Sequence, residues 1–181
     1  GVKVESVDFK NKTVLAAGKK YSYKNLISTQ PLPELLKQIK NVPSEILKSA
    51  QNLCATSVRC INIGLKYKKE IPALIKNKHW IYLPEKKFPF YRAGIYSNAN
   101  PNSAPENSYC IYVEFSSCNG RFEDTQDTVK YLKQAGIIGI KDEITAVNVI
   151  DIPYAYVIFD KKRKKTLEMI NKFLNDNDIY L

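Results

Sequence analysis

Glycine is scarce in this chain, with 7 residues in 181, and the spacing of these glycines excludes the common nucleotide-binding loops. Neither a G-x-G-x-x-G sequence nor a Walker-type loop is present. Both motifs bring backbone N–H groups against phosphates at the start of a helix. The sequence therefore predicts no pyrophosphate-binding loop within the chain.

Metal ligands and catalytic pairs are scarce as well. His79 is the only histidine, and the cysteines form no C-x-x-C pair, which argues against a zinc site. All four cysteines are predicted to be reduced thiols in the core: Cys54, Cys60, Cys110 and Cys118. Because the sequence shows no nucleophile–base pair and no cluster of carboxylates, we predict no catalytic residue and no metal site.

Long apolar runs are absent too. No stretch reaches the ~18 apolar residues that a membrane-spanning helix needs, and the first residues lack the apolar region of a signal peptide. These absences predict a soluble, cytoplasmic protein without a membrane span. The length of 181 residues nevertheless allows a substantial hydrophobic core.

Lysine and arginine are abundant, with 28 residues against 18 acidic ones and a net charge of +10. Such an excess is compatible with an anionic partner. The lysines are scattered, however, and the one dense run, at 161–165, begins a predicted helix, where it forms a solvated face. Because no groove-reading or base-stacking motif accompanies the charge, we do not expect nucleic-acid binding.

The pattern of apolar residues predicts an α+β fold. Residues 2–29 alternate as a β-meander that ends in a short apolar strand, and two short helices begin near Pro33 and Pro43. The later extended runs cover residues 54–67, 79–83, 91–97, 109–115 and 144–159, with a bend or sheet edge at Pro153. Consecutive strands with helices beside them favour a mainly antiparallel sheet with helices on one side.

Two later helices have recognisable starts. Asp124 or Thr125 is placed to cap a helix that Gly136 closes, and Asp160 is placed to cap a final amphipathic helix.

Arg59 is a charge within an otherwise apolar row of the run 54–67. It is predicted either at a sheet edge, with its guanidinium in solvent, or facing a ligand.

The aromatic-rich stretch 79–98 contains the candidate site. It holds the only Trp and predicts two short strands joined by a connection too long for a two-residue turn. In the second strand, alternation places Arg92, Tyr96 and Asn98 on one face. That face must meet water, a ligand or another domain, and Gly94 within it indicates a place of close approach.

Three segments carry a resemblance to a known superfamily. They are Tyr23-Lys24-Asn25-Leu26-Ile27-Ser28-Thr29-Gln30-Pro31-Leu32-Pro33, the stretch 79–98, and Ile152-Pro153-Tyr154-Ala155-Tyr156-Val157-Ile158-Phe159-Asp160. Together they resemble the FAD-dependent amine-oxidase-like superfamily, in its branch close to protoporphyrinogen oxidase and UDP-galactopyranose mutase. That superfamily begins with a Gly-rich strand–turn–helix and ends with a Gly-Arg segment, and this sequence has neither. The resemblance therefore implies the middle portion of a longer protein.

The resemblance also implies a division of the chain at residue 30. Residues 1–29 would complete the sheet of a missing FAD domain, and residues 30–181 would form the substrate-side α+β domain. Ser28 and Thr29 would be the cofactor-side residues, close to the flavin. The full-length parent would bind FAD, whereas this chain alone is expected to bind none and to be catalytically incompetent.

In the substrate-side domain, the resemblance implies substrate binding by Tyr82, Arg92, Tyr96 and Asn98, as aromatic walls with one cation. The alternative for these four residues is sheet packing with one solvated arginine. The substrate would be a small molecule that Arg92 could hold by an anionic group. The exposed edge of the meander would pair with the missing FAD domain or, in a homodimer, with a second copy.

Two functions are compatible with these observations. The first is the substrate-binding portion of a flavin-dependent oxidoreductase or mutase, in which the cofactor supplies the chemistry and the protein supplies the pocket. The second is a stand-alone basic module for an anionic partner: a nucleotide sugar, a nucleic acid or a protein. A G-x-G-x-x-G strand–turn–helix encoded upstream of residue 1 would support the first.

Overall fold

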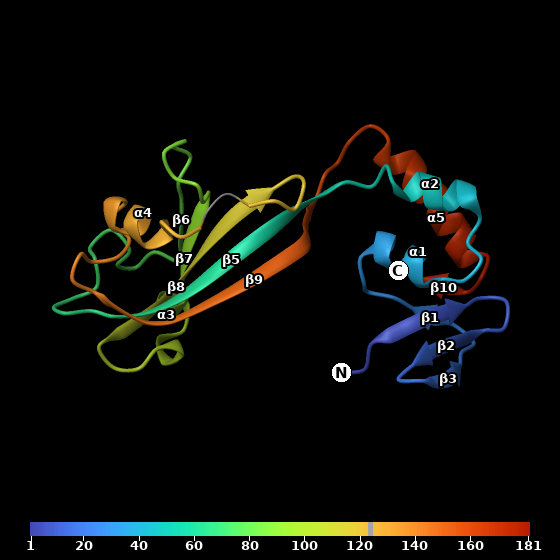
Figure 1. Cartoon of the computed structure of the whole chain (residues 1–181), viewed down its shortest axis with the longest axis horizontal. Coiled ribbons are helices and arrows are strands. Elements are labelled where there is room, and N and C mark those ends of the chain that lie inside the picture. The colour runs from blue at the N-terminus through green and yellow to red at the C-terminus, as the bar shows by residue number, and fades with distance from the viewer. Residues whose placement is uncertain (123–124) are drawn as a thin grey trace. The chain divides into compact units, whose positions relative to one another are not determined.

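The structure is a computed structural model that describes residues 1–122 and 125–181. The chain forms two compact units (Figure 1), one made of Gly1–Cys54 with Val157–Leu181 and the other of Ala55–Tyr156. This division differs from the boundary predicted at residue 30, because the helices that follow the meander share a core with it. The assignment of residues 1–29 to a missing FAD domain stays a prediction.

The first unit begins with the predicted meander. Its antiparallel strands are β1 (Val4–Asp8), β2 (Thr13–Ala16) and β3 (Lys19–Ser22). Ala17 and Gly18 join β2 to β3 with φ of 49° and 69°, the left-handed region that glycine enters without strain. β3 is exposed along its length and has only β2 beside it, so the meander has an open edge.

Residues from both ends of the chain meet in a two-stranded parallel sheet. β4 (Leu26–Ile27) pairs with β10 (Ile179–Tyr180). Around them lie the helices α1 (Leu32–Gln38), α2 (Ser44–Ala50) and α5 (Arg163–Asn175). The common core of these elements and the meander is Val7, Leu35, Leu36, Ile39, Ile46, Ala50, Ile170, Leu174 and Ile179.

Local chemistry sets the start of two helices in this unit. Pro33 lies in the first turn of α1, as predicted, where its missing N–H has no helical partner to lose. The Oδ1 atom of Asp160 accepts the backbone N–H groups of Lys162 and Arg163, at 3.0 and 2.8 Å, and so caps the start of α5 as predicted.

The second unit is built on a five-stranded antiparallel sheet in the order β6-β7-β8-β5-β9 (Figure 1). Its strands are β5 (Ala55–Lys66), β6 (Trp80–Tyr82), β7 (Arg92–Ile95), β8 (Ser108–Ser117) and β9 (Glu143–Val157). β5 and β8 pair over ten residues. Pro153 lies in β9, at the sheet edge, as predicted, where a missing N–H costs little.

One face of this sheet is buried against α4 (Thr128–Gln134). The side chains of this face are apolar: Ile61, Ile63, Leu65, Ala93, Ile95, Tyr109, Ile111, Val113 and Phe115. Leu132 of α4 packs in the same cluster. The fold class is therefore the predicted α+β, with a mainly antiparallel sheet, and the opposite face of the sheet is left for the polar and aromatic side chains.

The start of α4 differs from the prediction. Thr125 contributes its backbone carbonyl, which accepts the N–H of Thr128 at 3.1 Å, rather than a side-chain cap. Asp124, the other predicted cap, lies outside the described residues. Gly136, with φ of 71°, follows the last turn as predicted.

The strand predicted over residues 91–97 ends early. β7 stops at Ile95, and Tyr96 begins the short helix α3 (Tyr96–Ala99), which is followed by the 3-10 turn η1 (Pro101–Ser103). The alternation used to place Tyr96 and Asn98 on the face of Arg92 is therefore wrong, because it holds only while the backbone stays extended.

The cysteines are all free, but only some are in a core. Cys60 is buried, and burial raises the pKa of its thiol. Cys54 and Cys118 are exposed, so the prediction of core thiols is wrong for these two.

The helices within the described residues are all too short or too polar to cross a lipid bilayer.

Candidate functional site

The candidate site lies on the face of the five-stranded sheet opposite the core. Three residues stand side by side on it: Tyr82 of β6 is opposite Arg92 of β7, which is opposite Glu114 of β8. Period-2 alternation explains the row, because the neighbours Ala93 and Val113 point into the core. A cation, a carboxylate and an aromatic ring are thereby held on rigid strands.

Arg92 is the centre of this row. Its Nη2 atom donates to Glu114 Oε1 at 2.7 Å and to the hydroxyl of Tyr156 at 3.2 Å. Its guanidinium carbon lies 5.9 Å from the ring centroid of Tyr82, within cation–π range. The hydrogen bond to Glu114 raises the pKa of Arg92, so the guanidinium is a permanent charge.

Glu114 is held from two sides. Besides Arg92, the hydroxyl of Tyr91 donates to its Oε2 atom, and the side chain is 12% exposed. Burial, and then the hydrogen bond to Glu114, raise the pKa of Tyr91. Glu114 is therefore salt-bridged, and Tyr91 and Arg92 both hold its carboxylate in place.

A cavity of about 440 Å³ opens beside Arg92. Its lining residues come from all five strands of the sheet and from the segment before β7: Thr56, Tyr82, Tyr91, Arg92, Ser116 and Tyr156. Two polar atoms of this lining are buried without a hydrogen-bond partner in the described structure, Arg92 Nε and Thr56 Oγ1. Buried polar atoms are usually satisfied.

Gly94 has a neighbour within the protein rather than a ligand beside it. A Cβ atom at residue 94 would lie 2.0 Å from Cε1 of Tyr112, so the missing side chain makes room for the Tyr112 ring. That ring packs against Tyr96, with ring centroids 4.7 Å apart. The predicted close approach is therefore correct, and its occupant is Tyr112.

The four predicted substrate-binding residues are divided between different surroundings. Tyr82 and Arg92 line the same cavity. Tyr96 lines a separate cavity of about 470 Å³, together with Asn62, Asn148 and several small residues. Asn98 donates to the carbonyls of Ile75 and Lys78, both at 2.7 Å, and so fastens the loop before β6.

Sequence reasoning missed Tyr156, Tyr91, Thr56 and Ser116 as lining residues. Tyr156 lies 64 residues from Arg92 in the chain, and no local pattern links the two. Tyr91 had a weak signal, because it directly precedes Arg92 in an aromatic run. Thr56 has no signal of its own, since threonine is common in strands.

Arg59 is paired within the protein. Its Nε and Nη2 atoms donate to the two carboxylate oxygens of Asp151, at 2.7 and 2.9 Å, and its guanidinium lies 4.8 Å from the ring centroid of Phe122. The predicted edge position is wrong, because β5 lies between β8 and β9. Arg59 instead fastens β9 to the sheet.

The cofactor-side prediction concerns the segment after β4. The backbone N–H of Ser28 donates to the carbonyl of Tyr180 at 2.8 Å, and Thr29 is exposed. The segment between β4 and α1 has no Gly-rich turn, and the position of Ser28 and Thr29 beside a flavin stays a prediction. Residues 1–122 and 125–181 likewise contain no cluster of three His, Cys, Asp or Glu side chains that could hold a metal ion.

No protein-family model matches this chain. The structure has the fold of part of UDP-galactopyranose mutase and of part of a protoporphyrinogen oxidase-like protein, which confirms the resemblance indicated by the sequence. Reduced UDP-galactopyranose mutase matches 99% of this chain with a TM-score of 0.88 and 25% identity, over 40% of its own chain. A protoporphyrinogen oxidase-like protein of Exiguobacterium sp. 255-15 matches 93% of this chain, with a TM-score of 0.66 and 11% identity, over 38% of its own.

A fatty acid isomerase from P. acnes shares the fold as well, with a TM-score of 0.60, 9% identity and 99% of this chain covered. It too is matched over only 41% of its length. The chain thus spans about 40% of the length of these solved structures.

Proposed function

We propose that this chain is the substrate-binding portion of an FAD-dependent oxidoreductase or mutase, and that the cavity beside Arg92 receives the substrate. The observation that carries the proposal is the match of 99% of the chain to 40% of UDP-galactopyranose mutase, at a TM-score of 0.88. FAD, bound by the rest of the parent, would supply the redox or covalent chemistry. The residues of this chain would bind and orient the substrate.

The cavity suits a polar group of a small molecule. Tyr82 and Tyr156 are 59% and 50% exposed and stand at its rim, where aromatic rings can cover an apolar part of a ligand. The Nη2 atom of Arg92 donates to Glu114 and to the hydroxyl of Tyr156. Since a guanidinium has five N–H donors, Arg92 retains donors for a carboxylate or phosphate oxygen.

Glu114 limits what Arg92 can bind. Because the carboxylate already neutralises the guanidinium at 2.7 Å, an anionic group would meet both a cation and an anion. We therefore infer that Arg92 donates to one oxygen of the substrate. It does not form the two parallel hydrogen bonds by which an unpaired arginine binds a carboxylate or phosphate. Tyr96 and Asn98 would not contact a substrate in this cavity. Tyr96 would support Tyr112 by ring packing, and Asn98 would hold the loop before β6 in place.

The experiment is to extend the gene upstream of residue 1, express the longer protein and record its absorbance spectrum. We expect a G-x-G-x-x-G strand–turn–helix and stoichiometric flavin in the longer protein. The chain of 181 residues, purified in the same way, should be colourless, because it has no cradle of backbone N–H groups. A longer protein without flavin would overturn the proposal and favour the stand-alone basic module. Stoichiometric flavin in the short chain would overturn the expected division of roles.

A further inference from the structure

The basic run at residues 161–165 is an electrostatic anomaly at the start of α5. A helix N-terminus carries a partial positive charge and favours acidic side chains, yet the first turn of α5 has none. Asp160 is the nearest carboxylate, and its Oδ1 atom accepts the backbone N–H groups of Lys162 and Arg163. Among the described residues, no ion pair joins an acid to any lysine of this run.

An exposed aromatic tip lies next to this run. Phe159 is 83% exposed, and the apolar residues before it, Val157 and Ile158, are exposed as well. The guanidinium of Arg163 lies 4.8 Å from the ring centroid of Phe159, so the ring and the first basic turn form one surface. We call Val157, Ile158, Phe159 and the residues 160–165 the basic tip.

We propose that the basic tip binds the surface of a membrane that contains anionic lipids. Clusters of four to eight basic residues attract the acidic headgroups of a leaflet, and an aromatic ring is favoured at the boundary between headgroups and acyl chains. The apolar face of α5 is not available for this contact, because Ile170 and Leu174 are fully buried in the first unit. The contact is therefore made by the tip alone.

The chemistry of the tip favours lipid over nucleic acid. Proteins that bind single strands stack successive bases on several aromatic rings, whereas the tip offers one ring, that of Phe159. Val157 and Ile158 have no role against a sugar–phosphate backbone, but both gain by leaving water for a lipid phase. A basic run that directly follows an apolar segment in the chain complements a surface of acidic headgroups over an apolar interior.

The experiment measures binding of the 181-residue chain to vesicles of phosphatidylcholine, with and without 30% phosphatidylserine, by co-sedimentation. We expect at least tenfold tighter partitioning to the acidic vesicles, reduced by 0.5 M salt. Lys161→Glu with Lys162→Glu should lower it by more than tenfold, since each lysine contributes about fivefold. Phe159→Ser should lower it about tenfold by removing the ring from the interface.

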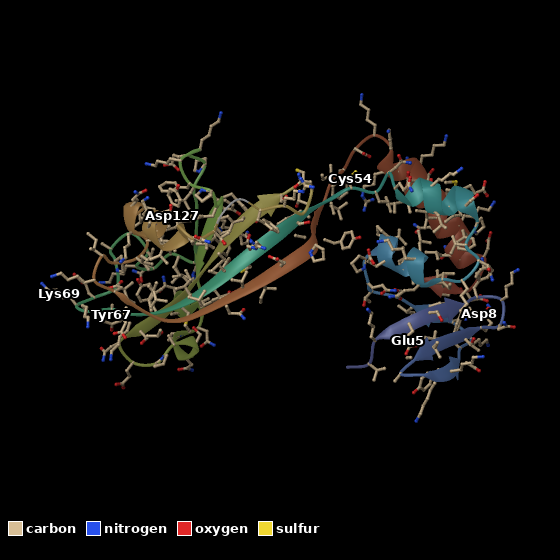
Figure 2. All side chains as sticks on the ribbon, viewed as in Figure 1. Glu5, Asp8, Cys54, Tyr67, Lys69 and Asp127 are labelled. Carbon is tan, nitrogen blue, oxygen red and sulfur yellow. The ribbon has the colours of Figure 1, made fainter. Side chains whose placement is uncertain are left out.

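The matched control is Lys68→Glu with Lys69→Glu, which changes the net charge equally at two exposed lysines of the loop after β5. Figure 2 labels Lys69 of this pair. This pair should alter partitioning less than threefold. Equal losses in the two double variants would overturn the proposal, because net charge alone would then explain binding. Equal partitioning to both vesicle types, or competition by a single-stranded oligonucleotide at lower concentration than by acidic vesicles, would also overturn it.

Circular dichroism of each variant checks that the fold is retained. Phe159→Trp in a Trp80→Phe background gives a second readout, since a ring that enters the interface shifts its emission to the blue. No shift with acidic vesicles, in a folded variant that still sediments with them, would overturn the insertion of residue 159.

Discussion

The ring of Tyr112 lies over the backbone of Gly94, so that a Cβ atom at residue 94 would be 2.0 Å from Tyr112 Cε1. The two residues face each other on β7 and β8. Since Tyr112 also packs on Tyr96, the glycine determines where both rings lie. Gly94 is thus a packing requirement of the face that carries Arg92.

Gly94→Ala should destabilise the protein by about 1–3 kcal/mol, the usual cost of overpacking. A methyl group would meet the rigid ring of Tyr112, which must move and lose its contact with Tyr96. Urea unfolding measures the change. Gly64→Ala is the matched control, because its Cβ would come no closer than 3.2 Å to a neighbour. A cost for Gly94→Ala that persists undiminished in a Tyr112→Ala background would contradict the explanation.

Arg92→Ala, made in the full-length parent, should weaken substrate binding by about 1–3 kcal/mol, as for one charge-assisted hydrogen bond, and leave flavin content unchanged. Arg92→Lys should not restore affinity fully, because an ammonium cannot bond Glu114, Tyr156 and a ligand in the same geometry. Isothermal titration measures affinity, and absorbance measures flavin.

Arg59→Ala is the control for this prediction, since Arg59 is also ion-paired but lies on the other face of the sheet. An ordinary surface substitution changes a free energy by no more than about 0.5 kcal/mol. If Arg92→Ala changes the free energy of substrate binding by no more than this, Arg92 is not a substrate ligand.

The free energy of unfolding should fall as the pH rises above about 10, partly because of Tyr109. This residue is fully buried, and burial followed by its 2.6 Å hydrogen bond to Asp142 raises its pKa. Above the usual tyrosine pKa of about 10, the unfolded chain releases this proton while the folded protein keeps it. The stabilisation is complete below that pH and is lost above it, by about 1.4 kcal/mol per pH unit.

Urea unfolding from pH 8 to pH 11, for the wild type and Tyr109→Phe, tests this dependence. The variant should be less stable at pH 8, by about 1 kcal/mol for the lost hydrogen bond. Its stability should then fall less steeply with pH than that of the wild type. Parallel slopes for the two proteins would exclude Tyr109 as a source of the alkaline loss.

Residues 1–29 should exchange their amide hydrogens faster than the β5–β8 pair. β3 is an exposed edge strand and β4 has two residues, whereas β5 and β8 pair over ten residues next to a buried core. Hydrogen exchange followed by mass spectrometry measures the difference. If the meander pairs with a second copy of the chain, its amide exchange should become slower as the protein concentration rises. The prediction would be contradicted if residues 1–29 were the best-protected segment of a monomer.

Local periodicity predicted much of the fold. The meander, the strand that contains Tyr109 and Phe115, and the helix after Asp160 follow from alternation, helical spacing and a cap, all of which act within a few residues. Where the backbone changes conformation, the same reasoning fails. Tyr96 continues the alternation of β7 in sequence but begins α3 in the structure.

The candidate site was less accessible to sequence reasoning. Arg92 and Tyr82 were found because both lie in one aromatic stretch and on paired strands. Glu114 and Tyr156 reach Arg92 from strands that are 22 and 64 residues away, and only strand order and register bring them there. Alternation predicts the face of a side chain, but it does not predict its partner across the sheet.

The parallel pairing of Leu26 with Ile179 has a consequence for synthesis on the ribosome. The second unit, Ala55–Tyr156, is continuous in the chain and can fold as soon as it has emerged, whereas the first unit needs its last helix and strand. Until residues 163–180 have left the exit tunnel, the apolar side chains of α1 and α2 lack Ile170, Leu174 and Ile179 as neighbours. Of these two units, the segment of residues 1–54 is therefore the one that stays longest without its neighbours and the one more in need of a chaperone.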